Sequence, residues 1–288
     1  MRIGIVANHT KNEAITAAQD LYRWLAEKGI DCDMPDYHYG ENKSGLTEDD
    51  RKALLAIAEK VNLMVAFGGD GTVLSVARTV APAGKPVFPV NVGGMGFLTE
   101  VKVSGVYKAM EEILAERYII EHRMMLEIEL RQFCELALNE VVIHRGSTPQ
   151  PAHILISRQN KSPISFCGDG VIISTPTGST AYSLSAGGPV LDPAVCAILC
   201  TPICPQARFL RPFILPPDEE LTIDAKIMTG GDLEVFVDGQ IALPFKWGEK
   251  LVVRRSKTDF SLIRIKGWEL FQVLRERMEW MDPREDKV

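Results

Sequence analysis

The sequence lacks the features that mark membrane proteins, nucleic-acid-binding proteins and disordered chains. No segment reaches the roughly 18 consecutive apolar residues that a membrane-spanning helix needs. Lys and Arg number 32 against 38 Asp and Glu, and the net charge of −6 disfavours nucleic acid or an anionic membrane as a partner. Apolar residues make up 46% of the 288 positions, which argues against disorder. The composition predicts a globular protein with one large domain or two ordinary ones.

Signals for export and for a cysteine metal site are also missing. The first residues run directly into a strand pattern without the layout of a signal peptide, so we expect a cytoplasmic protein. The last three of the six cysteines are spaced by four residues: Cys196, Cys200 and Cys204. That spacing would suit a metal site on a helix, but Pro202 and Pro205 interrupt the segment. Its neighbours are apolar, which favours buried structural thiols over metal ligands.

The first hundred residues alternate between strand and helix patterns. The predicted strands cover residues 2–7, 61–67 and 86–90, and the predicted helices cover 12–28, 48–60 and 72–80. Gly29 stands where the C-cap of the first helix belongs, and Thr47 with Asp50 resembles a capping box. Alternation of this kind indicates an α/β domain whose parallel sheet is covered by helices on both faces.

After a helix predicted near 104–116, the alternation of strands and helices ends and strand patterns follow one another. Further strand patterns occur at 119–131, 135–144, 153–158, 164–175 and 219–265. They predict a β-rich, β-sandwich-like second domain. Trp268–Trp280 returns to helical spacing, and we expect this helix to pack back on the first domain. The predicted division is therefore 1–100, 101–265 and 266–288.

Two phosphate-binding motifs are absent, the P-loop and the Gly-x-Gly-x-x-Gly fingerprint, which excludes these two classes at the level of motif. In their place Gly68-Gly69-Asp70-Gly71-Thr72 stands between a predicted strand and a predicted helix. Glycines let backbone amides approach a ligand, and the start of a helix attracts phosphate. Asp70 would repel phosphate, so it suits a base for an attacking hydroxyl or a ligand of magnesium. A tight turn with an N-capping Asp is the structural alternative.

Two more segments have the character of ligand-binding loops. Residues 91–98 carry Gly93, Gly94 and Gly96 at the end of another predicted parallel strand, where ligands of open α/β sheets bind. A hinge between domains is the alternative explanation. Residues 169–189 lead from a buried strand into a run of small hydroxyl residues with a tyrosine and paired glycines. Such a run can hydrogen-bond a purine and a ribose, or it can be a Ser/Thr-rich turn before a capped helix.

These three segments, together with Leu138-Asn139-Glu140-Val141-Val142, resemble the motif set of the NAD kinase family over roughly residues 2–280. The Asp-containing glycine motif is shared with 6-phosphofructokinases and with diacylglycerol and sphingosine kinases. The Asn-Glu pair and the Thr-Pro-Thr-Gly-Ser-Thr-Ala-Tyr-Ser run are much more restricted. The resemblance implies an α/β domain, a β-rich domain and a closing C-terminal helix, in a homodimer or homotetramer.

The resemblance also implies a role for each matching residue. Asp70 would accept the proton of the 2′-hydroxyl of the adenosine ribose of NAD. ATP or polyphosphate would donate the phosphate, and the divalent metal ion that the resemblance implies is Mg²⁺. The phosphate loops would comprise Gly68, Gly69, Thr72, Gly93, Gly94 and Gly96. The substrate-binding residues would be Gly71, Asn139, Glu140, Asp169, Thr180, Ala181, Tyr182, Ser183, Leu184, Ser185 and Gln240.

The chain departs from the family pattern at two positions. Cys167 stands where a basic residue is common, so another cation does its work or the contact is weaker. Gln206 stands where a histidine is common, and His153 aligns only loosely with the site. Two rival functions stay open at this stage: a lipid kinase of the diacylglycerol type, and a non-catalytic NAD(P) sensor that retains the pocket.

Overall fold

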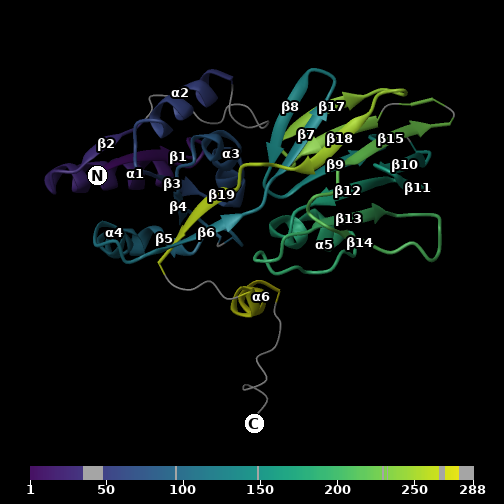
Figure 1. Cartoon of the computed structure of the whole chain (residues 1–288). Helices are drawn as coiled ribbons and strands as arrows, with labels where there is room; N and C mark the ends of the chain where they lie inside the picture. The colour runs from purple at the N-terminus through teal and green to yellow at the C-terminus, as the bar shows by residue number, and fades with distance from the viewer. Residues whose placement is uncertain are drawn as a thin grey trace, which may run out of the picture.

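The computed structural model describes residues 1–34, 48–94, 96–147, 149–228, 230–231, 233–265 and 270–278. It shows an α/β domain beside a β-rich domain (Figure 1). Both domains were predicted from the alternation of strand and helix patterns, and both predictions are confirmed. The Thr47–Asp50 capping box involves a residue outside the described part of the chain.

The first domain is built on one mixed sheet with helices on both faces. Its strands are β1 (Arg2–Ala7), β2 (Asp31–Asp33), β3 (Leu63–Gly68), β4 (Val87–Asn91), β5 (Val101–Lys102), β6 (Ile119–Arg123) and β19 (Phe260–Arg264). Its helices are α1 (Asn12–Glu27), α2 (Glu48–Ala58), α3 (Asp70–Val80) and α4 (Val106–Leu114), with short 3-10 turns at Ala81–Ala83 and Val103–Gly105. The strand order is β2-β1-β3-β4-β19-β6, and β5 pairs with β4. All pairs are parallel except β19 with β6.

Two hydrophobic layers sandwich this sheet. On one face Leu21 of α1 and Met110 of α4 are buried with Phe67 of β3. On the other face Leu54 of α2 and Val76 of α3 share a second buried cluster. The helical spacing of these apolar residues in the sequence is what makes each helix cover the sheet with one side. Gly29 ends α1 with a φ of +73°, the left-handed conformation expected after a helix.

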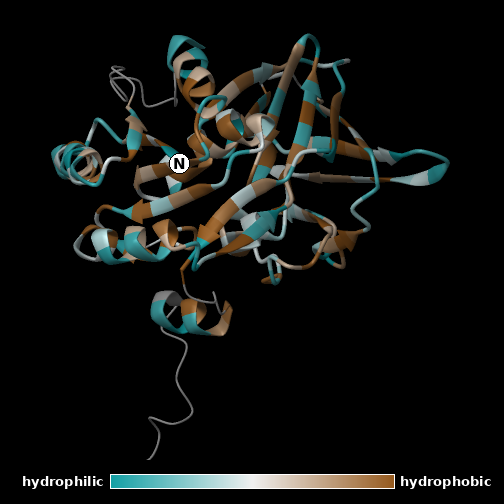
Figure 2. Cartoon of the chain, turned by 60° about the vertical axis from the view of Figure 1, so that its left-hand side comes forward, coloured by the Kyte–Doolittle hydropathy of each residue, from teal (hydrophilic) through white to brown (hydrophobic). Residues whose placement is uncertain are grey.

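The second domain is a sandwich of two antiparallel sheets with six strands each. One sheet has the order β11-β10-β15-β18-β7-β8, from Lys161–Gly168, Ala152–Arg158, Leu221–Ile227, Leu251–Arg255, Leu126–Leu130 and Phe133–Ala137. The other has the order β14-β13-β12-β9-β16-β17, from Phe213–Leu215, Ile198–Ile203, Gly170–Ser174, Glu140–His144, Leu233–Val237 and Ile241–Phe245. Apolar side chains from both sheets form one core. Figure 2 shows hydrophobic residues along the strands and on parts of the helices.

The chain crosses between the domains twice. β6 and β19 both belong to the first sheet, although they lie within the range 101–265. The division at residue 100 therefore stays a proposal about the chain, and the first sheet takes three strands from beyond it: β5, β6 and β19. The expected C-terminal helix is present as α6 (Leu270–Met278), with Leu274 buried. Figures 1 and 2 draw α6 below both sheets, and its docking on the first domain stays a prediction.

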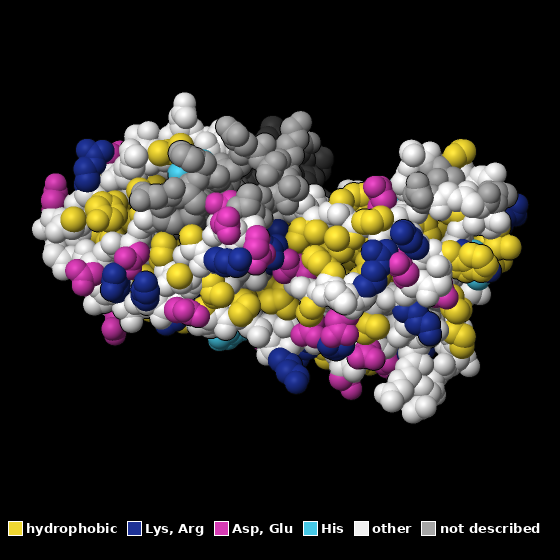
Figure 3. Space-filling view, turned by 90° about the horizontal axis from the view of Figure 1, so that it is seen from above, with side chains coloured by type: hydrophobic (Ala, Val, Ile, Leu, Met, Phe, Trp, Pro, Cys, Tyr) yellow, Lys and Arg dark blue, Asp and Glu magenta, His cyan; other side chains and the backbone are white. Residues whose placement is uncertain are grey.

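Charged side chains of both signs are interspersed over the face of the molecule seen in Figure 3. Among the described residues, every helix is too short or too polar to cross a lipid bilayer. Cys200 is buried, whereas Cys196 and Cys204 are exposed. The prediction of buried thiols at these three positions is therefore right for Cys200 and wrong for the other two, because β13 ends at Ile203 and its flanking loops are open to solvent.

Candidate active site

Three loops meet at the carboxyl edge of the first sheet. The side-chain amide of Asn8, directly after β1, donates to the hydroxyl of Thr72 at 3.2 Å. The amide of Val92, directly after β4, donates to the carbonyl of Gly68 at 3.1 Å. Lys11 closes the group, since its ammonium donates to the carbonyl of Val92 at 2.7 Å. This edge is where open α/β sheets bind their ligands, and both glycine-rich segments lie on it.

Asp70 joins the two glycine-rich segments. It is the first residue of α3, and its carboxylate accepts hydrogen bonds from the amides of Phe97 at 2.6 Å and Leu98 at 3.1 Å. A Cβ atom on Gly96 would lie 1.7 Å from the Asp70 carboxylate, so only glycine fits there. The carboxylate is thus held in one orientation by the backbone of the second loop. A carboxylate has about four lone-pair sites, so a substrate hydroxyl can join these amides as a donor.

The second loop also approaches a cation that sequence reasoning missed. Gly93 has a φ of +108°, and a Cβ atom there would lie 3.3 Å from the Lys11 ammonium. Lys11 is the N-cap residue of α1, only four positions after β1 ends. A lysine between the first strand and the first helix was the available signal, because that junction lies on the same edge as Asp70. Gly94, in contrast, has open space around it.

The Asn139–Glu140 pair is fixed from two sides. The carboxylate of Asp238 accepts the amides of Leu138, Asn139 and Glu140 at 3.1, 2.8 and 3.2 Å. From the other side, the hydroxyl of Thr175 donates to the carbonyl of Leu138 at 2.6 Å. The segment at the start of β9 is therefore held by side chains of the residues that directly follow β16 and β12.

A cavity of about 390 Å³ opens beside this segment, within the size range of small-molecule sites. Its lining residues are Glu140, Val142, His144, Tyr182, Phe236 and Gly239. The Glu140 side chain is only 6% exposed, and its Oε2 has no hydrogen-bond partner within the described part of the chain. Burial, and secondarily the nearby Asp238, raise the pKa of Glu140 to about 8. A polar ligand in this cavity would supply the partner that Oε2 lacks.

The Ser/Thr-rich run folds into a 3-10 turn (Thr177–Thr180) and the short helix α5 (Tyr182–Ser185). Of its predicted substrate-binding residues, Tyr182 lines the cavity and is 41% exposed. Ser183 is buried, and its hydroxyl hydrogen-bonds that of Thr201 at 2.7 Å. Thr180 donates to the carbonyl of Thr177 at 3.2 Å. Among the other positions, Ala181 and Leu184 are half-buried and Ser185 is exposed.

Asp169 lies beside a cation, although Cys167 replaces the expected basic residue. The Nε of Arg145 donates to the Asp169 carboxylate at 2.7 Å, and the Arg145 amide donates to the Asp169 carbonyl. Cys167 on β11 lies opposite His153 on the neighbouring strand β10. These strands belong to the sheet that does not contain β9 and β12. Arg145, at the end of β9, is thus the basic residue next to Asp169.

Gln240 contacts the first turns of α3. Its amide nitrogen donates to the carbonyl of Gly71 at 2.7 Å, and its oxygen accepts from Ser75 at 2.6 Å and from Arg78. Arg78 also donates to Asp238 at 2.8 Å, and both side chains are almost fully buried. Sequence reasoning did not single out Arg78 or Asp238, because nothing local in the sequence marks their pairing.

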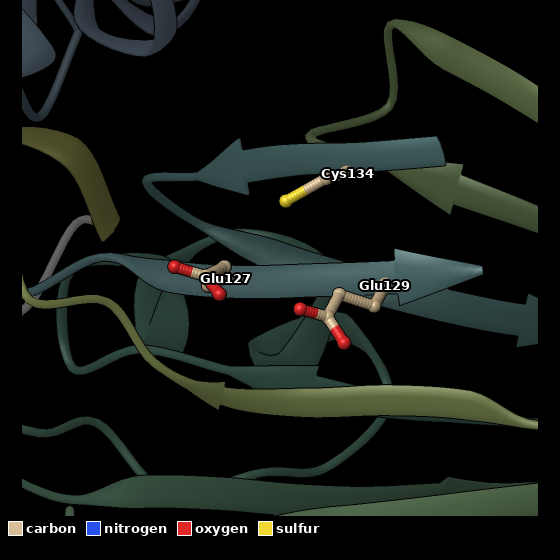
Figure 4. Close-up of side chains that lie close together, drawn as sticks. All are labelled: Glu127, Glu129 and Cys134. Atoms are coloured by element: carbon tan, nitrogen blue, oxygen red, sulfur yellow. The ribbon is translucent and has the colours of Figure 1, made fainter. Parts of the chain in front are cut away.

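One group of three possible metal ligands was found among the described residues: Glu127, Glu129 and Cys134. Figure 4 shows the two glutamates on one strand and Cys134 on its neighbour. Arg254 donates to both carboxylates, which balances their charge, and we assign no metal there. Mg²⁺ is commonly held by nucleotide phosphates with one or two carboxylates, an arrangement for which Asp70 at the glycine loops is suited.

Comparison with known proteins identifies the family to which the chain belongs. Residues 3–118 match the family described as ATP-NAD kinase N-terminal domain, and residues 138–265 match the ATP-NAD kinase C-terminal domain. The NAD kinase of Heliobacterium modesticaldum is 38% identical over 282 residues, covering 96% of this chain and 98% of that protein. The NAD kinase of Thermoanaerobacter sp. is 36% identical over the same length.

The chain belongs to the NAD kinase family. Its fold is shared with yeast NADH kinase solved with NADH, at a TM-score of 0.81 and 25% identity over 97% of this chain and 88% of that one. An NAD kinase from Archaeoglobus fulgidus solved with ATP has the same fold at a TM-score of 0.75 and 20% identity, covering 98% of this chain and all of the other. The family assignment makes the chain a phosphotransferase and an NAD kinase, and it does not favour the lipid-kinase or sensor alternatives.

Proposed function

We propose that the chain transfers the γ-phosphate of ATP to the 2′-hydroxyl of the adenosine ribose of NAD, giving NADP, with Asp70 as the base. The observation that carries this proposal is the position of the Asp70 carboxylate. It is fixed by the amides of Phe97 and Leu98 at the edge where three sheet loops meet. Phosphoryl transfer requires the attacking hydroxyl, its base and the phosphate to be positioned together.

The donor phosphates would lie along the two glycine-rich loops. Gly68, Gly69 and Thr72 lie at the start of α3, and the start of a helix attracts anions. Gly93, Gly94 and Gly96 line the facing loop, and Lys11 brings a positive charge beside it. Mg²⁺ bound between the phosphates would neutralise the charge that develops during transfer.

NAD would occupy the second domain's side of the site. Glu140 offers a carboxyl group at the cavity, and Tyr182 offers a ring for stacking. Asn139, which directly precedes Glu140, is proposed to bind the dinucleotide through its side-chain amide. Asp169, with Arg145 beside it, is proposed to reach the dinucleotide as well, and across a subunit boundary if the chain forms a homodimer or homotetramer. A cytoplasmic location stays a prediction.

The experiment is a direct assay of the purified protein with Mg²⁺, NAD or NADH, and a panel of ATP, other nucleoside triphosphates and polyphosphate. We expect formation of NADP from NAD and ATP that stops when Mg²⁺ is chelated and returns when it is restored. Tight NADP binding without any NADP formation would indicate a sensor. Phosphorylation of diacylglycerol in preference to NAD would indicate a lipid kinase.

A further inference from the structure

A buried ion pair joins the two domains directly behind the proposed active site. Arg78 lies on α3 of the first domain, and Asp238 lies in the turn that follows β16 of the second. Their side chains are 1% and 0% exposed, and Arg78 donates to the Asp238 carboxylate at 2.8 Å. Desolvating two charges generally offsets their attraction, so an apolar pair of the same size would hold the domains together equally well. A role in stability alone therefore does not explain why charges are present.

The other contacts of Asp238 lead to the proposed NAD-binding side. Its carboxylate accepts the amides of Leu138, Asn139 and Glu140, so one side chain sets the backbone of all three residues. Burial raises the pKa of Asp238, while Arg78 and the amides of Asn139 and Leu138 act in the opposite direction by favouring the carboxylate. Arg78 thus supplies the charge that lets a buried carboxylate organise the Asn139–Glu140 segment.

The contacts of Gln240 lead to the catalytic side. Its oxygen accepts from Arg78 and Ser75, and its nitrogen donates to the carbonyl of Gly71 at 2.7 Å. Gly71 directly follows Asp70. Asp238 and Gln240 can both face α3 because the turn between β16 and β17 is left-handed, with φ of +49° at Asp238 and +63° at Gly239. An aspartate tolerates that conformation better than most residues.

We propose that Arg78, Asp238 and Gln240 form a clamp that positions Asp70 relative to the Asn139–Glu140 segment. None of the three needs to touch the reacting atoms, so they are positioning residues. The proposal rests on the proposed function, because it assigns these residues to the reaction between a hydroxyl near Asp70 and a substrate bound at Glu140. Small displacements of reacting groups are sufficient to reduce turnover strongly.

The first test compares Arg78→Met, Asp238→Asn and the double variant. Each single variant leaves one buried charge without its counter-charge and is expected to lower the unfolding midpoint. In the double variant both charges are gone, so the midpoint should recover while kcat stays about 10- to 100-fold below wild type and the KM for NAD stays raised, as expected for a misplaced site. A purely structural role predicts that kcat and KM recover together with stability in the double variant, and that result would overturn the proposal.

Arg51 provides the matched control. It also forms an ion pair between the domains, from α2 to Glu135 of β8, but it contacts neither the start of α3 nor the Asn139–Glu140 segment in any hydrogen bond of the described residues. Arg51→Met should change kcat and the KM for NAD by less than about twofold when folded, in line with a partly exposed pair. A loss of turnover equal to that of Arg78→Met would show that any interdomain ion pair has this effect, and would also overturn the proposal.

Hydrogen exchange tests the clamp without relying on activity. Arg78→Met alters α3, yet it should speed exchange of the amides of Leu138, Asn139 and Glu140 by about tenfold or more, because their common acceptor moves. Arg51→Met should leave these amides unchanged. Unchanged exchange in Arg78→Met would refute the clamp even if the enzyme is active. Failure of the wild type to form NADP would refute the proposed function and leave the exchange result to be judged on its own.

Discussion

The two sides of the site are built in different ways. On the first domain the backbone does most of the positioning, since amides of Phe97 and Leu98 hold Asp70 and glycines make room for it. On the second domain side chains line the cavity, with Glu140 and Tyr182 among them. On the side positioned by backbone, a single added Cβ atom should lower turnover. The side-chain-built side should respond to changes of charge and protonation.

The largest effect is expected from removing the base. Asp70→Asn should lower kcat by about 10²- to 10⁴-fold, the contribution of a well-placed base, and leave NAD binding largely intact. The measurement is steady-state NADP formation together with NAD affinity by calorimetry. The two amides each donate to a different oxygen of Asp70, and asparagine keeps only one oxygen in its side chain. Hydrogen exchange at Phe97 and Leu98 is therefore the control for the position of the loop. Turnover equal to wild type would show that Asp70 is not the base.

A methyl group at Gly96 tests the backbone-built side directly. Gly96→Ala places a Cβ atom 1.7 Å from the Asp70 carboxylate, so the loop or the aspartate must move. We expect kcat to fall by about 10- to 100-fold, because reacting groups displaced by about 1 Å lose turnover on that scale. Gly94→Ala is the comparison, since open space surrounds that position and the loss should be several-fold smaller. Equal losses in the two variants would contradict the steric explanation.

Lys11 should act on the phosphate donor rather than on NAD. Lys11→Met removes a positive charge beside the glycine loop and keeps most of the side chain's length. We expect the KM for ATP to rise by about tenfold, the effect of losing roughly one charge-assisted hydrogen bond, while the KM for NAD changes little. Initial rates with each substrate varied in turn provide the check. A selective rise in the KM for NAD would place the donor elsewhere.

The smallest effect concerns Glu140 and pH. Its pKa in the folded protein is about 8 against an ordinary 4.5, so between these values the folded state keeps a proton that the unfolded chain releases. The wild-type free energy of unfolding should therefore fall as pH rises through that window. Glu140→Gln removes this titrating group. The difference in free energy of unfolding between the variant and the wild type should therefore shift in favour of the variant from pH 5 to pH 9, as measured by urea unfolding. Glu129→Gln is the control: Arg254 lowers the pKa of this exposed carboxyl, so no such increase is expected.

Local patterns were sufficient to predict most of the architecture. Leu21 and Leu25 are buried on α1, and their helical spacing in the sequence already predicts one apolar face. All residues of β3 are buried, as its continuous apolar run predicts for a strand covered on both sides. The Asp70 turn was predicted for the same reason, since a strand, a glycine turn and a helix are contiguous in the sequence. α3 begins at Asp70 rather than at Thr72, because Gly69 serves as its N-cap.

Contacts between distant residues could not be predicted in this way. Asp70 meets Phe97 across 27 positions, and Arg78 meets Asp238 across 160. Lys11 looks like any solvated lysine until β1 and β4 are placed in one sheet. Ser183 belongs to a run that suits ligand binding, but the hydroxyl of Thr201 on β13 is its partner in the fold. Pairing of this kind is decided by how strands are ordered, which a single sequence does not specify.

The place of β19 has a consequence for how the protein is made. This strand lies between β4 and β6 in the first sheet, yet its residues come from positions 260–264. When a ribosome has completed residues 1–123, it has made the other strands of this sheet, β1 to β6, while the inner place between β4 and β6 is still empty. That place is filled only after the whole sandwich has emerged. The amino-terminal half cannot complete its sheet on its own. Cutting the chain between the halves should therefore yield two fragments that need each other to fold.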